Sequence, residues 1–134
     1  MTLPDDVRRL FEGPNYAHLA VLLPGGAPVS IPIWAGVEDG ELVFFTQPSS
    51  SKARYLAGDR RLALSVVDHE NPYRSARVRG HVARTVEGDE ALAIIDRLSV
   101  KYTGAPFPLR DGVVYVIEPE RASFMELPFR HEPG

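Results

Sequence analysis

The chain has 134 residues, a formal net charge of −3 and no cysteine. This length suits one domain with an ordinary hydrophobic core, since domains usually take roughly 100–200 residues. We therefore predict a single domain over residues 1–134. The lack of cysteine excludes disulfides, thiolate zinc sites and Cys nucleophiles, and the slightly acidic balance argues against a nucleic-acid-binding protein.

Neither a secretory signal nor a membrane span is expected. Residues 1–13 lack the basic leader, the apolar run and the small-residue cleavage site of a signal peptide. No apolar stretch reaches the roughly 18 residues that a membrane-spanning helix needs. We therefore expect a cytoplasmic protein with no membrane partner.

The first third of the chain predicts a short helix followed by a three-stranded meander. Thr2 is a possible helix cap, and Gly13 is the expected stop. Pro28 and Pro32 have no N–H to donate, so the second strand should lie at a sheet edge or carry a bulge near Pro32. The three strands, separated by Pro-Gly-Gly and Glu-Asp-Gly turns, are expected at residues 18–23, 29–35 and 41–46.

The rest of the chain predicts two helices and four more strands. The helices are expected at residues 52–57, ended by Gly58, and from Asp89 to the stop at Gly104. Gly80 suggests a bulge or the close approach of a ligand, and Pro119 is expected in a tight turn between the last two strands. The strands are expected at residues 62–68, 76–86, 113–118 and 122–127, with frayed residues from Pro128 onward.

Short strands joined by hairpin-length turns predict a mostly β protein. A parallel sheet would need helices between most of its strands, and these are missing. We therefore predict an antiparallel β-barrel with accessory helices.

Residues 46–54, Thr-Gln-Pro-Ser-Ser-Ser-Lys-Ala-Arg, form the segment richest in binding groups. They place hydroxyls, two cations and the free N–H groups of a helix start in one strand-to-helix turn, which can hold a phosphate dianion. The glycines of a P-loop are absent. The alternative is a serine run that caps a surface helix, with Lys52 and Arg54 solvated.

A second basic cluster consists of Arg74, Arg77 and Arg79. Arg77 and Arg79 share one face of a strand because side chains alternate with a period of two. They could face an anion or the carboxylates of a partner. The alternative is a solvated face on which cross-strand Glu residues pair with them.

Other polar and aromatic residues give weaker signals. The histidines lack metal-ligand spacing, so neither a metal site nor a catalytic triad is predicted. Glu118 and Glu120 are expected to be solvated at a turn. Trp34, Phe44 and Phe45 could stack on a flat ligand, although a core role is the favoured interpretation. The histidines are at positions 18, 69, 81 and 131.

Taken in order, a series of stretches resembles the FMN-binding split-barrel superfamily, whose fold is that of pyridoxamine 5′-phosphate oxidase. Within it, the chain is most similar to the flavin/deazaflavin oxidoreductases of group B, which use coenzyme F420. The resemblance extends from about residue 5 to about residue 122. The stretches are residues 17–22, 29–34, 51–54, 64–68, 71–74, 78–82, 101–104 and 117–121.

The resemblance implies an antiparallel split β-barrel that forms a homodimer, with cofactor sites in grooves between the subunits. Lys52 would hold the cofactor phosphate together with Thr46, Ser51 and the backbone of Ala53. The tricyclic ring would be lined by Pro32, Ile33 and Trp34. The partner subunit would contribute Asn71, Pro72 and Tyr73, with Arg77 or Arg79.

The resemblance also implies an oxidoreductase that uses F420 to transfer a hydride to or from a small organic substrate. The protein would bind and orient the cofactor, which itself carries the electron chemistry. Residues 47–49 contain no Arg before the serine run, and residues 123–127 contain no Trp, both departures from relatives. One alternative is an FMN-dependent oxidase or reductase of the pyridoxamine-phosphate type, and another is a cofactor-binding protein without turnover.

Overall fold

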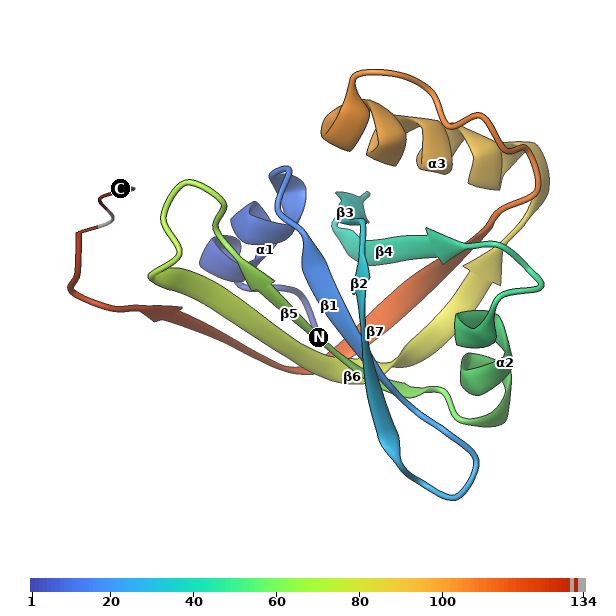
Figure 1. Cartoon of the computed structure of the whole chain (residues 1–134), viewed down its shortest axis with the longest axis horizontal. Helices are drawn as coiled ribbons and strands as arrows, with labels where there is room; N and C mark the ends of the chain where they lie inside the picture. Colours follow the sequence, from blue (N-terminus) through green and yellow to red (C-terminus); the bar gives the residue numbers. More distant parts are fainter. Residues whose placement is uncertain (131, 133–134) are drawn as a thin grey trace.

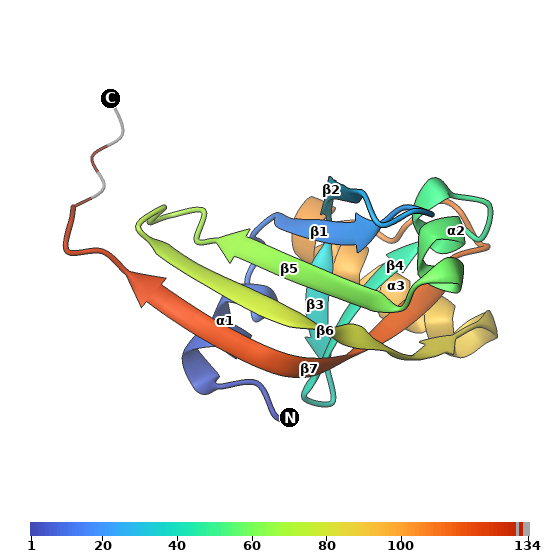
Figure 2. The same ribbon diagram turned by 90° about the horizontal axis from the view of Figure 1, so that it is seen from below.

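The structure is a computed structural model that describes residues 1–130 and Glu132. Within these residues, seven strands form one antiparallel sheet in the order β2-β1-β5-β6-β7-β4-β3, which curls into a half-barrel (Figures 1 and 2). The strands are β1 (Ala17–Leu22), β2 (Pro28–Ile33), β3 (Ala35–Glu38), β4 (Glu41–Thr46), β5 (Arg61–Val67), β6 (Arg74–Val86) and β7 (Val113–Glu126). The predicted mostly β, antiparallel architecture is confirmed.

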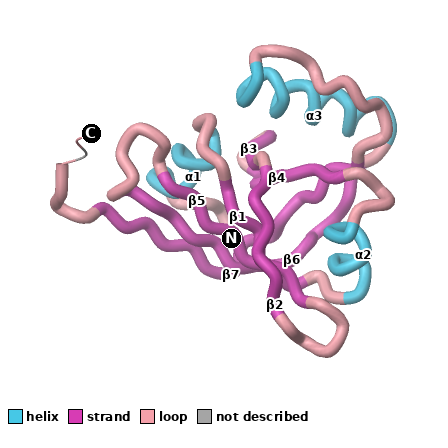
Figure 3. The backbone as a smooth tube through the Cα atoms, viewed as in Figure 1, coloured by secondary structure: helices cyan, strands magenta, loops and turns pink. Residues whose placement is uncertain are grey.

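Three helices accompany the sheet in the described part of the chain. They are α1 (Asp5–Glu12), α2 (Ser51–Gly58) and α3 (Gly88–Thr103). Figure 3 shows α2 and α3 flanking β4. Gly104 ends α3 in the left-handed conformation, with φ of 82°, as glycine tolerates. The predicted stop at Gly13 also holds, but Pro4 rather than Thr2 occupies the N-cap of α1, and no side chain caps that helix.

The predicted three-stranded meander is wrong, because the run expected as one strand at 29–35 breaks at Trp34. Residues 29–33 of this run belong to β2, which pairs with β1, whereas Ala35 begins β3, which pairs with β4. β2 and β3 therefore lie at opposite edges of the sheet. The edge position predicted from Pro28 and Pro32 is confirmed, whereas the β1–β2 register runs through Pro32 without a bulge.

The predicted turn at Pro119 is also wrong. Residues on both sides of it belong to β7, which pairs with β6 along nearly its whole length. Gly80 lies opposite Pro119, and the register shifts between Arg79 and Gly80. A Cβ atom on Gly80 would lie 2.1 Å from the Glu118 carbonyl oxygen, so the predicted bulge is real and the closely approaching group is β7 backbone. The bulge is what lets a proline occupy an interior strand.

The hydrophobic core has two parts, one on each face of the sheet. Adjacent residues on β4 serve both: Phe44 packs into the larger part, and Val43 into the smaller part beneath α3. This two-sided burial explains why β4 and residues 113–117 of β7 are nearly continuous apolar runs. No helix among residues 1–130 and 132 is long and apolar enough to cross a membrane.

Candidate functional site

The turn between β4 and α2 is organised around Ser50. The Ser50 hydroxyl oxygen accepts hydrogen bonds from Thr46 Oγ1 at 2.7 Å and from the Ala53 N–H at 3.2 Å. Ser50 is therefore the N-cap of α2, so the capping role offered as the alternative for this serine run is real. Thr46 is buried, with 5% of its surface exposed. Sequence reasoning chose Ser51 from this run and missed Ser50.

Donors remain available in this turn. In the described part of the chain, the N–H groups of Ser51 and Lys52 have no acceptor, and the Lys52 ammonium has neither an ion pair nor a hydrogen bond. Ser51 Oγ accepts a bond of 3.3 Å from Arg54. Hydroxyls, helix-start N–H groups and an unpaired cation are the donor set that binds phosphate.

Trp34 stands at the junction of β2 and β3, within a cluster of aromatic rings. Its ring is stacked on Tyr102 at 5.2 Å between centroids and 9° between planes. Phe45 and Phe107 approach it edge to face at 6.2 and 6.1 Å. Trp34 is half-buried, so the favoured core interpretation holds fully for Phe44 alone, which is buried and stacked on Tyr115.

The predicted ring-binding and phosphate-binding segments adjoin. Ala35 pairs with Phe44, and the Trp34–Phe45 ring contact continues the same antiparallel alignment toward Thr46. Trp34 thus lies beside the strand that ends in the Ser50 turn. Ile33 is buried and Pro32 is exposed at the edge of β2. Trp34 therefore connects the β2 residues of the predicted ring site to the strand that leads into the Ser50 turn.

Arg77 and Arg79 lie on the outer face of the sheet, in a groove of about 690 Å³. Their cross-strand neighbours are small or basic: Ser65 and Ser123 flank Arg77, and Ala63 and Arg121 flank Arg79. No described residue forms an ion pair with Arg77, Arg79 or Arg121. The alternative of cross-strand Glu partners therefore holds for Arg74, which pairs with Glu126, but not for Arg77 and Arg79. Sequence reasoning missed Arg121 because the turn expected at Pro119 interrupted the strand period.

The groove reaches from these arginines to the β2 edge. The register places Pro32, His18, Ser65 and Arg77 in one row across the sheet. Three interstrand spacings of about 4.8 Å separate the ends of this row, or roughly 14 Å. Arg77 therefore shares a face with Pro32 of its own chain but does not touch it.

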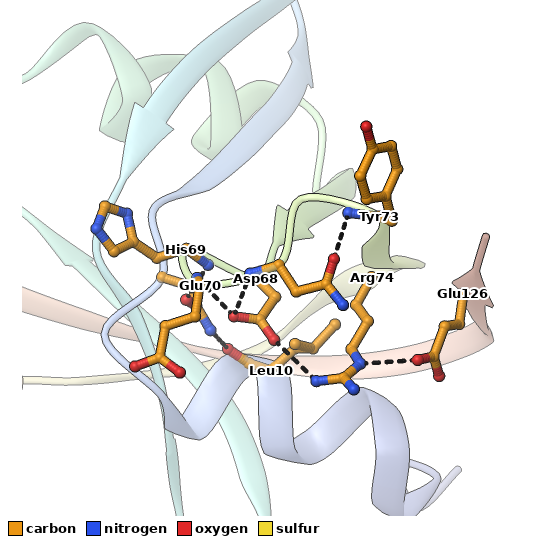
Figure 4. Close-up of polar contacts among 9 residues, drawn as sticks. Leu10, Asp68, His69, Glu70, Tyr73, Arg74 and Glu126 are labelled. Atoms are coloured by element: carbon orange, nitrogen blue, oxygen red, sulfur yellow. Dashed lines mark hydrogen bonds and ion pairs between the residues drawn. The ribbon is translucent and has the colours of Figure 1, made fainter. Parts of the chain in front are cut away.

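The loop between β5 and β6 holds the remaining predicted residues, and it is tightly hydrogen-bonded (Figure 4). Asn71 Oδ1 accepts a bond of 3.1 Å from the Tyr73 N–H, and Asp68 Oδ1 accepts one of 2.9 Å from the Glu70 N–H. Arg74 lies between two carboxylates, 3.0 Å from Glu126 and 3.6 Å from Asp68. Its pKa is raised, chiefly by the hydrogen bond to Glu126.

The loop is remote from the phosphate turn. Both ribbon views place it at the end of the sheet opposite α2 (Figures 1 and 2). Pro72 is exposed, and the Tyr73 ring is tilted against Phe129 at 5.3 Å. A single chain thus does not bring Asn71, Pro72 and Tyr73 to the Ser50 turn.

Glu118 and Glu120, which were expected to be solvated at a turn, have ionic partners within the chain. Glu118 and Glu120 lie in β7 rather than at a turn; Glu118 pairs with the N-terminal amine, and Glu120 lies 2.6 Å from His81 Nδ1. The pKa of Glu118 is lowered, mainly by that hydrogen bond. The described residues contain no cluster of three or more metal-ligating side chains, and His131 lies outside them.

Sequence reasoning placed Lys101 and Tyr102 in the last predicted helix and in one of the stretches that carry the resemblance, and it gave them no role in the site. Burial lowers the pKa of Lys101 from 10.5 to about 8, opposed by the charges of Glu12 and Glu38. Burial also raises the pKa of Tyr102. Both side chains contact backbone far away in the sequence, which no local pattern reveals.

Comparison with known proteins agrees with this architecture. A family model described as pyridoxamine 5′-phosphate oxidase matches residues 4–125. A pyridoxine/pyridoxamine 5′-phosphate oxidase from Roseobacter denitrificans (strain ATCC 33942 / OCh 114) is 37% identical over 89 residues, which are 66% of this chain and 43% of that protein. The match thus spans less than half the length of that relative.

Solved structures also match. An F420 reductase is 31% identical, with a TM-score of 0.78 over 90% of this chain and 98% of that one. A conserved hypothetical protein from Mycobacterium tuberculosis is 22% identical, with a TM-score of 0.80 over 100% and 94% of the two chains, and supports the fold alone.

The curled antiparallel sheet is a split-barrel-like fold, and it places the Ser50 turn beside an aromatic strand junction. The chain belongs to the pyridoxamine 5′-phosphate oxidase family. This is an oxidoreductase-like family whose members bind flavin-type cofactors, so the resemblance to the superfamily is confirmed.

Proposed function

We propose that this protein is an oxidoreductase that uses coenzyme F420 to transfer a hydride to or from a small organic substrate. The observation that carries the proposal is the junction of two sites: a Ser50-centred turn with an unpaired Lys52, and the half-buried ring of Trp34 beside it. The first suits a phosphate, and the second suits a flat ring. A flavin or deazaflavin carries both in one molecule.

The residues present fit a phosphate group. Ser50 already accepts two hydrogen bonds, which leaves its own O–H to donate outward. The Ser51 and Lys52 N–H groups lie at the positive end of α2, and the Lys52 ammonium adds a full charge. Each of these donors would contact the phosphate, with Thr46 fixing Ser50 from behind.

The ring would lie along Pro32, Ile33 and Trp34. The β2 edge offers backbone groups without a strand neighbour, and Trp34 offers an aromatic surface. When bound, F420 supplies the hydride chemistry at its deazaflavin ring. The chain's own residues bind the phosphate, orient the ring and cover one side of it against water.

Completion of the site would come from a second copy of the chain. Asn71, Pro72 and Tyr73 lie at the end of the sheet opposite α2, so a partner could present them where one chain cannot. The unpaired arginines at 77 and 79 would supply positive charge from the same partner face. We therefore propose a homodimer with two shared sites.

Two observations favour F420 over FMN. The F420 reductase structure matches nearly the whole chain at 31% identity, and residues 47–49 lack the Arg that FMN-binding relatives often present.

The second candidate is FMN-dependent oxidation of a pyridoxamine phosphate-type substrate, favoured by the family model and by the Roseobacter relative. The two are separated by titrating purified protein with oxidised F420 and with FMN. We expect tighter binding of F420. Tighter binding of FMN, or a yellow flavin-bearing protein after purification, would establish the second candidate instead.

A further inference from the structure

The last turn of α3 makes hydrogen bonds to the backbone of Ala35, the residue that follows Trp34. Lys101 Nζ donates to the Ala35 carbonyl at 2.5 Å and to the Phe11 carbonyl at 2.9 Å. The Tyr102 hydroxyl donates to the Asn15 carbonyl at 2.7 Å and accepts from the Ala35 N–H at 3.2 Å. Both backbone polar groups of Ala35, the residue after Trp34, are therefore bound by two consecutive residues of α3.

The same helix turn also holds the Trp34 side chain. The Tyr102 ring is nearly parallel to that of Trp34, and Tyr16 continues the stack at 5.6 Å and 25°. The Lys101 ammonium lies 4.7 Å from the Tyr102 ring centroid, a cation–π contact. The orientation of the Trp34 ring thus depends on Tyr102, and that of Tyr102 on its hydroxyl bonds.

An ammonium is a costly group for this position. Burial disfavours its charge, and the Glu12 and Glu38 carboxylates only partly compensate. A Met would cover the same surface without that desolvation. What the ammonium adds is contact with two carbonyls, one of them near the C-terminal end of α1, where helix carbonyls lack partners. Lys101 therefore ties α1, α3 and the start of β3 together.

We propose that Lys101 and Tyr102 are positioning residues of the cofactor-ring site, which fix the β2–β3 junction and the plane of the Trp34 ring. Neither residue lies in the turn that would bind the phosphate. This inference rests on the proposed function for the identity of the ring, but the effect on Trp34 itself is measurable in the protein alone.

The chain has one tryptophan, so its fluorescence reports on Trp34 directly. Tyr102→Phe keeps the aromatic ring and removes the hydroxyl, and Lys101→Met keeps the length of the side chain. Ile94→Val, a buried change on the same helix, is the control. In the protein without cofactor, we expect greater acrylamide quenching and lower anisotropy of Trp34 in the first two variants and unchanged values in the control.

Affinity then separates the ring site from the phosphate site. FMN is compared with riboflavin, and F420 with its phosphate-free deazaflavin chromophore. Loss of one or two hydrogen bonds behind Trp34 should weaken binding of the phosphate-bearing and phosphate-free members of a pair by the same factor, about threefold to tenfold. Lys52→Ala should weaken only the phosphate-bearing member.

The outcomes distinguish the two proposals. Unchanged Trp34 quenching in both variants, or an affinity loss confined to the phosphate-bearing ligands, would overturn the positioning role. Tyr102→Phe decides the question even if Lys101→Met fails to fold. Wild-type protein that binds none of the four ligands would overturn the proposed function and the ring site with it, while the quenching comparison would still show whether α3 holds Trp34.

Discussion

The β4–α2 turn and the outer face of the sheet satisfy their polar groups in opposite ways. At the β4–α2 end, the side chains of Thr46 and Ser50 bond each other and the start of a helix, so the turn is already organised in one chain. On the outer face, Arg77 and Arg79 line a groove and have no charged partner among the described residues. Clustered like charges without partners are unfavourable unless something else neutralises them. The comparison teaches that one half of the site is built locally, whereas the other half needs a ligand or a second copy.

The largest expected effect is at the organised end. Lys52→Ala should weaken F420 binding by about 1.5–3 kcal/mol, or roughly tenfold to a hundredfold, because a charge-assisted hydrogen bond to phosphate is lost. Arg54→Ala is the matched control, since Arg54 is exposed and bonds only Ser51 Oγ among the described residues. Titration and thermal melting of both variants would check this. Equal affinities for the two variants would move the phosphate away from this turn.

The second-largest effect is expected from Arg77 and Arg79 on the outer face of the sheet. Mixing of subunits shows which chain supplies these arginines to each site. Arg77→Ala combined with Arg79→Ala should weaken F420 binding about tenfold, the scale of one charged contact. Mixed dimers of this variant with Lys52→Ala should regain near wild-type affinity at about half of their sites, because one site receives Lys52 and both arginines from different subunits. Mixed dimers without any strong site would show that each chain uses its own arginines. A monomeric mass by light scattering would remove the shared site altogether.

The sequence predicts what is local at each end and misses what is distant. The turn at residues 46–54 can be predicted because its donors are consecutive in the sequence. The prolines of β2 correctly predict an edge strand. Pro119 misleads, because its place inside β7 depends on Gly80, which opposes it from another strand. The misplaced turn hides Arg121. The break at Trp34 has no local signal of its own, since the strand pattern continues through it.

The half-buried ammonium of Lys101 should make the stability of the protein depend on pH. Lys101 has a folded pKa of about 8, below its ordinary 10.5, because of burial. Between these values, the unfolded chain keeps a proton that the folded chain has lost, so stability rises with pH. The stability of the wild type relative to Lys101→Met should therefore rise by on the order of 1–2 kcal/mol from pH 8 to pH 10.5, after allowance for solvent. Urea denaturation across this range would measure it, and a constant or falling difference would contradict the buried-ammonium assignment.

The smallest expected effect comes from an arginine close in sequence to the unpaired cluster but different in its surroundings. Arg74 lies opposite Glu126 on β7, bonds it at 3.0 Å and lies 3.6 Å from Asp68, so its charge is already neutralised within the chain (Figure 4). Exposed ion pairs of this kind contribute little to stability, and a guanidinium held by two carboxylates has little attraction left for an anionic ligand. Arg74→Ala should therefore change the unfolding free energy very little and leave F420 affinity unchanged at every salt concentration. The Arg77 and Arg79 variant should instead lose the part of F420 affinity that falls as ionic strength rises, because unpaired surface charges attract anions through a screened field. If Arg74→Ala reduced affinity and its salt dependence as much as that variant did, the distinction between paired and unpaired arginines would carry no functional meaning, and the groove would be acting through its overall charge.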